Sequence, residues 1–384
     1  MPIKTKYCLS WCLLFLAFTL SLGCTSSQIT KPQTQAYHQA NKLFHQKPQW
    51  MGADAAISIP LSTNRTIWLF GDTFIATSPS NQRKESTLIR NSIGIQNGLD
   101  PRNATIDFFW DKQTNTKPEA FFHDQNKDPH KAWYWPGNGY RIKNGPLIIF
   151  LYDMTITDAQ PPFNFALSGY TLAIINNPDE TPDRWNMQIK HAPPTNTKFI
   201  PASALIKDNQ HLVALTIKTS PPHAATLVRY PINDIATGNT NHAQWWLGNM
   251  LGWIDQTKLN GREPAIVIDD AAPESSLHYD STTKQYIHIA SYGFGETTIG
   301  YRTSSALTGP WSKPTMIFSP PEGAEENIFV YAAKAHPELK TDQPNQLLIT
   351  YATNSMNFAD IFKPEKEKTL YYPQFVITTI PQKQ

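Results

Sequence analysis

The sequence predicts an all-β protein, and more specifically a five-bladed β-propeller, on the basis of three observations. From Trp50 onward the chain has short runs rich in β-branched and aromatic residues and no long stretch with a 3.6-residue period. One pattern recurs five times: a small or polar residue opens a strand, a polar turn follows, and a more apolar strand comes next. Turn signals separate the runs at regular intervals, at Asn97-Gly98, Asn144-Gly145, Thr237-Gly238 and Pro320-Pro321.

The five copies begin at Asp54, Asn138, Ser203, Glu274 and Ala332. After the paired strands of the first four copies we expect further strands at residues 92–96, 106–110, 169–175, 185–190, 225–230, 244–247, 297–303 and 314–318. The fifth copy has one further strand, at residues 373–379. About four strands per copy suit a propeller blade, whose opening strand lies nearest the axis. A large β-sandwich or two separate β-domains is the alternative, because β-sheet sequences mimic one another.

The chain opens with a segment typical of export. Two lysines precede an apolar run from Cys8 to Leu22, which is the order of charge and apolarity in a secretory signal. The run is shorter than the roughly 20 apolar residues that a membrane-spanning helix needs. Residues 21–24 resemble a bacterial lipobox, so residues 1–23 are predicted to be a lipoprotein signal peptide and Cys24 the lipidated residue. We expect the protein to be exported and anchored through a lipid to the outer membrane of a bacterium. The alternative is secretion after cleavage of an ordinary signal peptide.

The next segment, residues 24–49, is polar, rich in glutamine and nearly aperiodic. It is predicted to form a tether with one short helix near residues 36–44, ahead of a propeller domain at residues 50–384. All three cysteines of the chain lie before this domain. The domain therefore has no disulfide, no thiolate nucleophile and no cysteine metal site.

The charge of the predicted domain argues against nucleic acid as a partner. Without the two lysines of the leader, the 33 basic residues of the chain fall to a number equal to the 31 acidic residues. A domain with no net charge and no basic run lacks the electrostatic surface that a polyanion requires. Its aromatic and charged fractions, 12% and 17% of the chain, are typical of an exported β-protein that binds neutral ligands.

Two aspartates flank the first pair of strands. The apolar runs Ile57–Leu61 and Thr66–Phe70 are split by a polar turn, with Asp54 before the first run and Asp72 directly after Gly71 at the end of the second. If the runs pair as a hairpin, their outer ends meet and both carboxylates lie at one edge of the sheet. Carboxylates placed together in this way can perform general acid–base hydrolysis. Either aspartate alone could equally be a turn residue.

Several stretches resemble one family of proteins. They are residues 52–61 (GADAAISIPL), 67–74 (IWLFGDTF), 90–92 (RNS), 135–139 (WPGNG), 331–339 (YAAKAHPEL) and 347–355 (LLITYATNS). These stretches resemble uncharacterised bacterial secreted and lipoprotein five-bladed propellers of the DUF4185 type, some of which are linked to endo-D-arabinanase activity. More distantly, the chain is similar to arabinanase, levanase and invertase propellers, which carry three carboxylates in a central funnel. The resemblance covers most of the chain from residue 50 and implies an envelope-anchored or secreted glycoside hydrolase that cleaves arabinan-like furanose glycans by carboxylate acid–base catalysis.

On this resemblance Asp54 and Asp72 are the expected catalytic acids, and Glu274 at the head of the fourth copy is the third acid of the funnel. The second copy departs from the pattern, because Asn138 stands where relatives often carry aspartate and an amide cannot act as a general base. Asp153, at the end of a predicted strand, could replace it, although a strand-end aspartate is often a turn residue. The alternative function is therefore a non-catalytic propeller lipoprotein that binds carbohydrate or protein.

Further polar and aromatic residues are expected to bind an oligosaccharide or polysaccharide substrate. With Asn138 and Asp153, these are Arg90, Asn91, Trp135, Tyr292, Lys334 and His336. Most aromatic residues of a propeller pack in its core, so the stacking role has a structural alternative. No cofactor or metal is expected from the motifs, which include no HExxH, P-loop or GxSxG pattern. The resemblance alone implies that His336 could ligate a central calcium ion. The alternative is that His336 is a core histidine held by hydrogen bonds.

Overall fold

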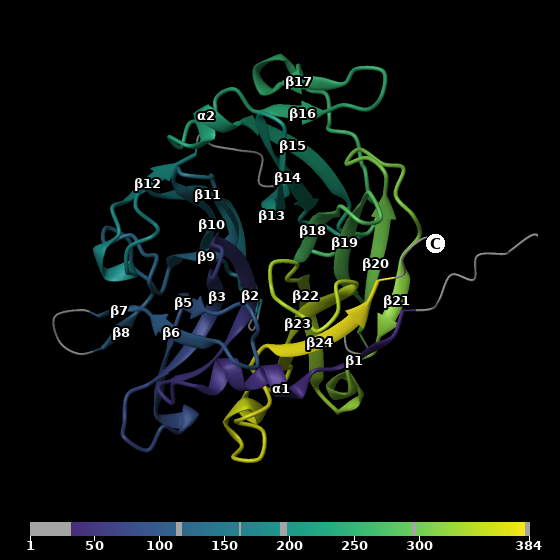
Figure 1. Cartoon of the computed structure of the whole chain (residues 1–384). Coiled ribbons are helices and arrows are strands. Elements are labelled where there is room, and N and C mark those ends of the chain that lie inside the picture. The colour runs from purple at the N-terminus through teal and green to yellow at the C-terminus, as the bar shows by residue number, and fades with distance from the viewer. Residues whose placement is uncertain (1–31, 113–116, 161–162, 193–197, 294–296, 381–384) are drawn as a thin grey trace, which may run out of the picture.

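The computed structural model describes residues 32–112, 117–160, 163–192, 198–293 and 297–380, in which five antiparallel β-sheets form a ring (Figure 1). The first blade comprises β2 (Trp50–Ser62), β3 (Arg65–Ala76), β5 (Ser92–Asn97) and β6 (Thr105–Phe109), with β4 (Ser86–Ile89) paired to β3. The second comprises β9 (Ala132–Arg141), β10 (Leu147–Ile156), β11 (Phe165–Ile175) and β12 (Met187–His191). The third comprises β13 (Phe199–Asp208), β14 (His211–Lys218), β15 (Ala225–Pro231), β16 (Gln244–Trp246) and β17 (Trp253–Asp255).

The fourth blade comprises β18 (Ser275–Asp280), β19 (Gln285–Tyr292), β20 (Thr298–Ser304) and β21 (Thr315–Phe318). The fifth comprises β22 (Ile328–Ala335), β23 (Gln346–Ser355), β24 (Gln374–Thr379) and β1 (Thr34–Ala36). Outside the blades lie a ribbon of β7 (Asp111–Lys112) and β8 (Pro118–Glu119) and two helices, α1 (His38–Asn41) and α2 (Ile232–Ile235). The 3-10 turns are η1 (Lys42–His45), η2 (Arg83–Glu85), η3 (Pro182–Arg184), η4 (Gln256–Lys258), η5 (Pro321–Ala324) and η6 (Phe358–Phe362).

Each blade places the first strand of its sheet towards the axis. These strands contact one another in sequence around the ring: β2 with β9, β9 with β13, β13 with β18, β18 with β22, and β22 with β2. Every strand predicted from the repeat overlaps an observed strand, whereas β4, β17 and the ribbon of β7 and β8 were not predicted. The ring confirms the predicted five-bladed propeller and excludes the β-sandwich.

The apolar run at residues 147–151 in β10 illustrates how the blades pack. Its odd-numbered side chains join a cluster with the first blade, and its even-numbered side chains join a cluster with the third blade. Successive side chains of a strand point to opposite faces, so a strand between two blade interfaces buries both sets. All five side chains are fully buried, and each buried aliphatic side chain contributes about 2 kcal/mol. This double burial explains why the second strand of a copy is more apolar than the first.

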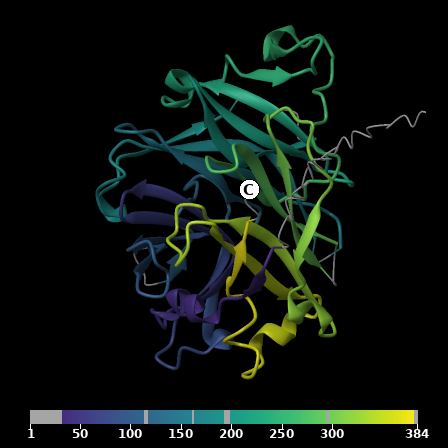
Figure 2. The same cartoon turned by 45° about the vertical axis from the view of Figure 1, so that its right-hand side comes forward.

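The fifth blade is completed by the N-terminal segment. β1 pairs with β24, with Gln35 opposite Ile377, and the N-terminal strand lies beside β24 in both cartoon views (Figures 1 and 2). The backbone N–H of Tyr37 then donates to the carbonyl oxygen of Phe375 at 2.7 Å. β1 is the fourth strand that the fifth copy of the repeat did not supply, and it joins the two ends of the chain in one sheet.

The structure therefore corrects the predicted tether at residues 24–49 over its described part, residues 32–49. The predicted short helix is present as α1 and η1, but it is packed on the propeller and Phe44 is fully buried. The Phe44 ring stacks on Phe375 at 5.4 Å between ring centroids and meets Trp68 edge-on at 5.1 Å. The polar composition of the segment concealed this role, because few apolar side chains suffice to anchor it.

The predicted signal peptide at residues 1–23 and the lipidation site Cys24 lie outside the described residues. Within the described ranges, no helix is both long enough and apolar enough to cross a membrane.

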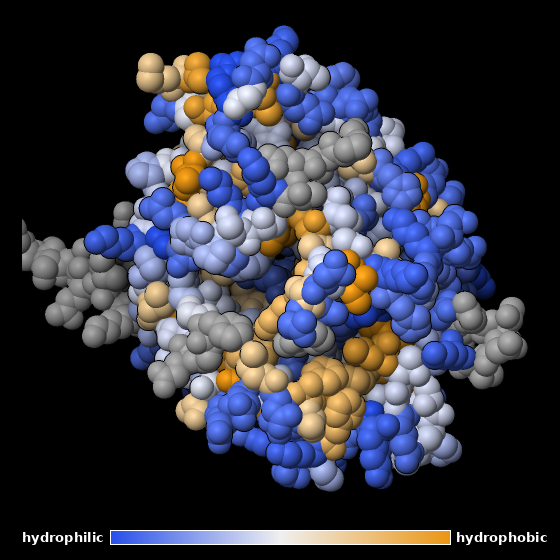
Figure 3. Space-filling model, turned by 180° about the vertical axis from the view of Figure 1, so that it is seen from behind, coloured by the Kyte–Doolittle hydropathy of each residue, from blue (hydrophilic) through white to orange (hydrophobic). Residues whose placement is uncertain are grey.

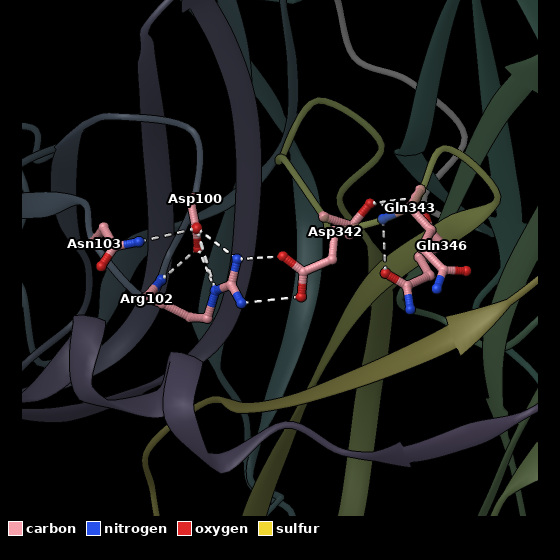
Figure 4. Close-up of polar contacts among 7 residues, drawn as sticks. Asp100, Arg102, Asn103, Asp342, Gln343 and Gln346 are labelled. Atoms are coloured by element: carbon pink, nitrogen blue, oxygen red, sulfur yellow. Dashed lines mark hydrogen bonds and ion pairs between the residues drawn. The ribbon is translucent and has the colours of Figure 1, made fainter.

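A second tie between the first and fifth blades, the Arg102 bridge, consists of Asp100, Arg102 and Asp342 (Figure 4). The guanidinium of Arg102 donates to both carboxylate oxygens of Asp342, at 3.0 Å from Nη1 and 2.7 Å from Nη2. It also donates to Asp100, at 2.9 Å from Nε and 2.8 Å from Nη2, and these bonds lower the pKa of Asp100. Because Asp342 lies between β22 and β23, the bridge holds loops of the two blades together.

We predict that Phe44→Ala lowers the free energy of unfolding by about 3–5 kcal/mol, because it removes a large, fully buried ring from the core. Urea denaturation followed by tryptophan fluorescence measures the change. The control is Lys42→Ala in the same segment, where the side chain is exposed and the expected change is within about 0.5 kcal/mol. If neither variant changed the free energy of unfolding, the segment would be a tether as the sequence predicted.

Candidate active site

The first two strands form the predicted hairpin around a turn at residues 63–64. Away from this turn the register becomes irregular, and Asp54 lies across from Gly71 and Asp72. The approach is close, since a Cβ atom added to Gly71 would lie 3.2 Å from the Cβ of Asp54. The two alanines that follow Asp54 have φ angles of 71° and 79°, a strained region that is common at functional sites. The two aspartates therefore lie at one end of the hairpin, as the sequence predicted.

Asp54 is held between two tyrosines of the fifth blade. The hydroxyl of Tyr331 donates to Oδ1, and the hydroxyl of Tyr371 donates to Oδ2 at 2.9 Å. Burial raises the pKa of Asp54 to about 8, repulsion from Asp72 and Glu274 adds to the rise, and the two hydrogen bonds oppose it. Asp54 is consequently a neutral carboxyl at pH 7, with two hydroxyl groups already placed around it.

Asp72 has a different environment from Asp54. Its Oδ2 accepts from Nη1 of Arg90 at 3.1 Å, and its Oδ1 accepts from Nε1 of Trp135 at 2.7 Å. Burial is the largest influence and raises the pKa of Asp72 above its ordinary value, although the charge of Arg90 and the hydrogen bonds from Trp135 and Arg90 oppose the rise. The Asp72 side chain is 13% exposed, so solvent reaches it. A cation and an N–H donor directed at one carboxyl group favour its ionised form.

Glu274 directly precedes β18 and brings a third carboxyl group to the site. Nζ of Lys334 lies 3.0 Å from Oε1 of Glu274 and also donates to the carbonyl of Ala332 at 3.3 Å. Glu274 is 36% exposed, whereas Lys334 is 4% exposed. Besides burial, the negative charge of Glu274 raises the pKa of Asp54 and of the Tyr152 hydroxyl, which places it near both. The three predicted acids thus converge, and each has its own partners.

Aromatic residues of the second blade lie beside Asp72. We name Trp133, Trp135, Phe163 and Phe165 the aromatic wall. The ring centroid of Trp135 lies 4.8 Å from that of Phe165. The ring centroid of Phe165 lies 6.3 Å from that of Phe163. Phe163 is 52% exposed, so the wall leads from the acid site to solvent. The side of the ring that faces away from the viewer in Figure 1 is hollowed near its middle, and apolar side chains border the hollow (Figure 3).

Asn91 holds the fold together and is not available for a sugar, contrary to the prediction. Its Nδ2 donates to the carbonyls of Phe122 and Tyr134, both at 2.9 Å, and its Oδ1 accepts from the backbone N–H of Phe122 at 2.7 Å. The side chain is fully buried. Its hydrogen bonds satisfy backbone groups that would otherwise be buried without partners.

His336 is also a core residue, and the structure supports the alternative given for it. Its Nδ1 is 2.6 Å from Oγ of Ser58 and its Nε2 is 2.7 Å from Oγ1 of Thr350, so both ring nitrogens are occupied by hydroxyl partners. Burial, followed by the charge of Lys334, lowers the pKa of His336 to about 3, which keeps the ring neutral. Among the described residues, no three or more acidic, histidine or cysteine side chains are grouped as metal ligands.

Three other predicted binding residues have hydrogen-bond partners other than the three acids. Asp153 accepts from Oγ1 of Thr171 at 2.9 Å, and the charges around it are those of Lys127, His191 and Asp124. It therefore does not replace the carboxyl group missing at Asn138, whose Oδ1 accepts from the backbone N–H of Gly139 at 2.8 Å.

Tyr292, the third of these residues, ends β19 rather than an innermost strand. Its hydroxyl oxygen accepts from Nε of Arg302 at 3.2 Å, and the Arg302 guanidinium lies 5.7 Å from its ring centroid. The prediction placed Tyr292 near the substrate; the structure gives it this arginine partner on β20 instead.

Tyr331 and Tyr371 are the site residues that sequence reasoning missed. Tyr331 is the first residue of the stretch at residues 331–339, in which only Lys334 and His336 were predicted to bind substrate. Tyr371 lies in an aperiodic loop, and its φ angle of 65° gives no sequence signal because glycine is the residue usually found there. A carboxyl group taken out of water needs hydrogen-bond donors, so a catalytic reading of Asp54 implies hydroxyl or N–H groups nearby.

We predict that Asp54→Asn changes the pH dependence of stability. The folded-state pKa of Asp54, about 8, exceeds its ordinary value of 3.8, so the folded protein binds this proton more tightly than the unfolded chain. Its stabilising contribution is complete below about pH 4 and is lost as the pH rises towards 8. Wild type should therefore lose stability relative to the variant over this range, by at most about 1.4 kcal/mol per pH unit.

Urea denaturation at several pH values between about 4 and 8 measures this difference. Asp100→Asn is the control, because Arg102 lowers the pKa of Asp100 and its contribution stays constant above the ordinary pKa of an aspartate. A constant difference for Asp54→Asn as well would mean that Asp54 is ionised at neutral pH.

The chain is similar in fold to several solved structures. The chain superimposes on a crystal structure of "a putative hydrolase" from Bacteroides ovatus ATCC 8483 with a TM-score of 0.70, at 18% identity and with 93% of each chain covered. It also aligns with levansucrase from Bacillus subtilis, at a TM-score of 0.45, 11% identity and 92% and 99% coverage of the two chains. The catalytic domain of a GH62 α-L-arabinofuranosidase from Coprinopsis cinerea gives a TM-score of 0.41, 11% identity and 86% and 91% coverage.

No curated protein matches the sequence. The resemblance to DUF4185-type propellers stays a prediction, because the family model that matches is a different one. The match includes part of the segment that was predicted to be a tether, in agreement with its packing on the propeller. Residues 37–379, most of the 384-residue chain, match the family described as a domain of unknown function, DUF5005, and the chain therefore belongs to this family.

Proposed function

We propose that this protein is a glycoside hydrolase whose site is built from Asp54, Asp72 and Glu274. The observation that carries the proposal is the contrast between the first two carboxyl groups. Asp54 is partly buried and its pKa is raised to about 8, so it is protonated at pH 7, whereas Asp72 is held by a guanidinium and an indole N–H. Glycoside hydrolysis needs one such protonated group and one ionised group, and neighbouring acids with divergent environments are the usual source of this pairing.

In this mechanism Asp54 donates its proton to the leaving glycosidic oxygen. The carboxylate that remains is stabilised at once by the hydroxyl donors of Tyr331 and Tyr371, which are already in place. Donors preorganised for a charge that develops in the transition state lower the barrier without further rearrangement. Asp72 acts on the other side of the bond, either by removing a proton from water or by attacking the anomeric carbon.

Glu274 contributes a third carboxyl group to the site. It is paired with Lys334, and its negative charge raises the pKa of Asp54. A carboxylate near the reacting carbon also opposes the positive charge of an oxocarbenium-like transition state. The more open position of Glu274 suits contact with the hydroxyl groups of a bound sugar.

The aromatic wall supports a carbohydrate substrate. An exposed aromatic surface that continues to Asp72 offers an apolar face on which a sugar ring can stack, while the buried part of the wall keeps it rigid. The absence of net charge in the sequence beyond the leader agrees with a neutral glycan. The finer assignment, an arabinan-like furanose glycan, rests on the family resemblance, and the hydrolase described from Bacteroides ovatus is compatible with it.

The alternative is a carbohydrate-binding propeller without catalysis. Asn138 favours it, since this amide replaces a carboxyl group of the resembling pattern and its oxygen bonds to the neighbouring backbone. The same aromatic wall would serve such a module, so activity decides between the two.

Export and lipid anchoring through Cys24 are proposed on the sequence alone. We predict that the protein incorporates labelled palmitate in a bacterial host and that Cys24→Ser abolishes incorporation. The control is Cys12→Ser, which leaves the lipobox cysteine in place. Label retained by Cys24→Ser would rule out this anchor.

We predict that wild type releases reducing ends from arabinan and that Asp54→Asn and Asp72→Asn each lower the rate by about 10²–10⁴-fold. A panel of arabinan, fructan and xylan, assayed by reducing-end release, measures the loss. The rate of wild type should also fall as the pH rises through about 8, because Asp54 then loses its proton.

The matched control is Asp153→Asn, which changes an aspartate within β10 of the neighbouring blade, hydrogen-bonded to Thr171, and should keep most of the activity. Binding of a glycan to wild type with no release of reducing ends would select the non-catalytic module instead. Full activity in Asp54→Asn would refute the role given to Asp54.

A further inference from the structure

A loop of the fifth blade reaches the proton donor of the first. We name residues 361–372, which run from the last residues of η6 towards β24, the return loop. Tyr371 in this loop donates to Oδ2 of Asp54 at 2.9 Å, and its own backbone N–H donates to the carbonyl of Thr353 at 3.1 Å. The position of the Tyr371 hydroxyl therefore depends on the path of a loop that has no regular secondary structure.

One arginine of the first blade binds this loop in several places. Arg83, in η2, is fully buried. Its guanidinium donates to the carbonyls of Ile361 and Glu367, both at 2.7 Å, and of Leu370 at 3.0 Å. It donates as well to the carbonyl of Met51 in β2, at 3.1 Å from Nε and 2.7 Å from Nη2. Arg83 thus binds the return loop to β2. Met51, its partner on this strand, lies three residues before Asp54.

Other contacts hold the loop in the same place. The backbone N–H of Arg83 donates to the carboxylate of Glu367, and its guanidinium lies 5.6 Å from the ring centroid of Tyr372. The loop passes so close to β2 that a Cβ atom on Gly52 would lie 2.2 Å from the carbonyl oxygen of Tyr371. Glycine at this position, with a φ angle of 104°, is what allows the approach.

The chemistry of arginine is specific to this role. A planar guanidinium presents five N–H donors in a fixed fork, so a single side chain can bind carbonyls that lie in different directions. A lysine ammonium has three donors on one atom and cannot reach the same set of carbonyls. The N–H donors of the Arg83 guanidinium therefore match the positions of the carbonyl groups that the return loop presents.

We propose that Arg83 is a positioning residue, which holds the return loop on the first blade so that the Tyr371 hydroxyl stays on Asp54. The groups that face Asp54 are Tyr331 and Tyr371 from the fifth blade, Asp72 with its Arg90 partner from the first, and Glu274 with Lys334. Tyr371 is the one of these whose place is set by Arg83. The name proton donor rests on the proposed function; the geometric link between Arg83 and Asp54 does not.

The test is the titration of Asp54 in the full-length protein. Aspartate labelled with ¹³C at the side-chain carboxyl is followed by NMR as the pH changes, and the Asp54 signal is identified by its loss in Asp54→Asn. Tyr371→Phe removes one hydrogen bond that favours the ionised form, so the midpoint should rise by about one pH unit. Arg83→Lys should shift the midpoint in the same direction by a similar amount, and it should cause no further shift when combined with Tyr371→Phe.

The matched control is Arg102→Lys, which weakens another link between the same two blades away from Asp54 (Figure 4). It should lower the melting temperature and leave the Asp54 midpoint unchanged. An unchanged midpoint in Arg83→Lys, or a shift that adds in full to that of Tyr371→Phe, would overturn the proposal. If Arg83→Lys does not fold, Glu367→Ala removes a loop contact of Arg83 and should raise the midpoint by a smaller amount; no rise there would overturn the proposal as well.

The titration uses no substrate, so it separates the two proposals. Coupling between Arg83 and Asp54 without any glycan hydrolysis would refute the proposed function and leave the positioning role intact. Hydrolysis by wild type without this coupling would refute the positioning role alone.

Discussion

The burial of one carboxyl group at the junction between the first and last blades is the constraint on which the site depends. Asp54 belongs to the first strand of the propeller, but both hydroxyl groups that bind it come from the fifth blade. A buried carboxyl group without such donors would destabilise the fold. Closing the ring therefore also assembles the site. β1, Arg83 and the Arg102 bridge all join the first and fifth blades at this junction.

The three acids of the funnel differ because their partners differ in kind. Hydroxyl groups surround Asp54, a guanidinium and an indole surround Asp72, and an ammonium accompanies Glu274. Burial raises the pKa of both aspartates; hydrogen bonds from hydroxyl groups oppose the rise at Asp54, whereas the charge of Arg90 is the main opposing influence at Asp72. The site thus combines one carboxyl group bound by hydroxyl groups with two carboxyl groups paired with cations.

The parts of this structure that sequence reasoning predicted are those set by local patterns. Strand alternation and the hairpin between Asp54 and Asp72 depend on residues close together in the chain, and both are present. β1 and Tyr371 escaped prediction because a three-residue strand and an irregular loop have no pattern of their own, and distant partners fix their places. Asn91 and His336 were misassigned for a related reason: their polarity is visible in the sequence, but the groups that satisfy it are not.

The pairing of β1 with β24 has a consequence for how the protein matures. Thr34 lies opposite Thr378, so the pairing joins strands that are far apart in the chain. Contacts of such sequence separation close late, because the chain entropy lost in joining distant ends has to be offset first. A chain whose ring is still open has Asp54 in water with its ordinary acidity. The raised pKa of this carboxyl group, and its two tyrosine partners, come into existence only when the ring closes.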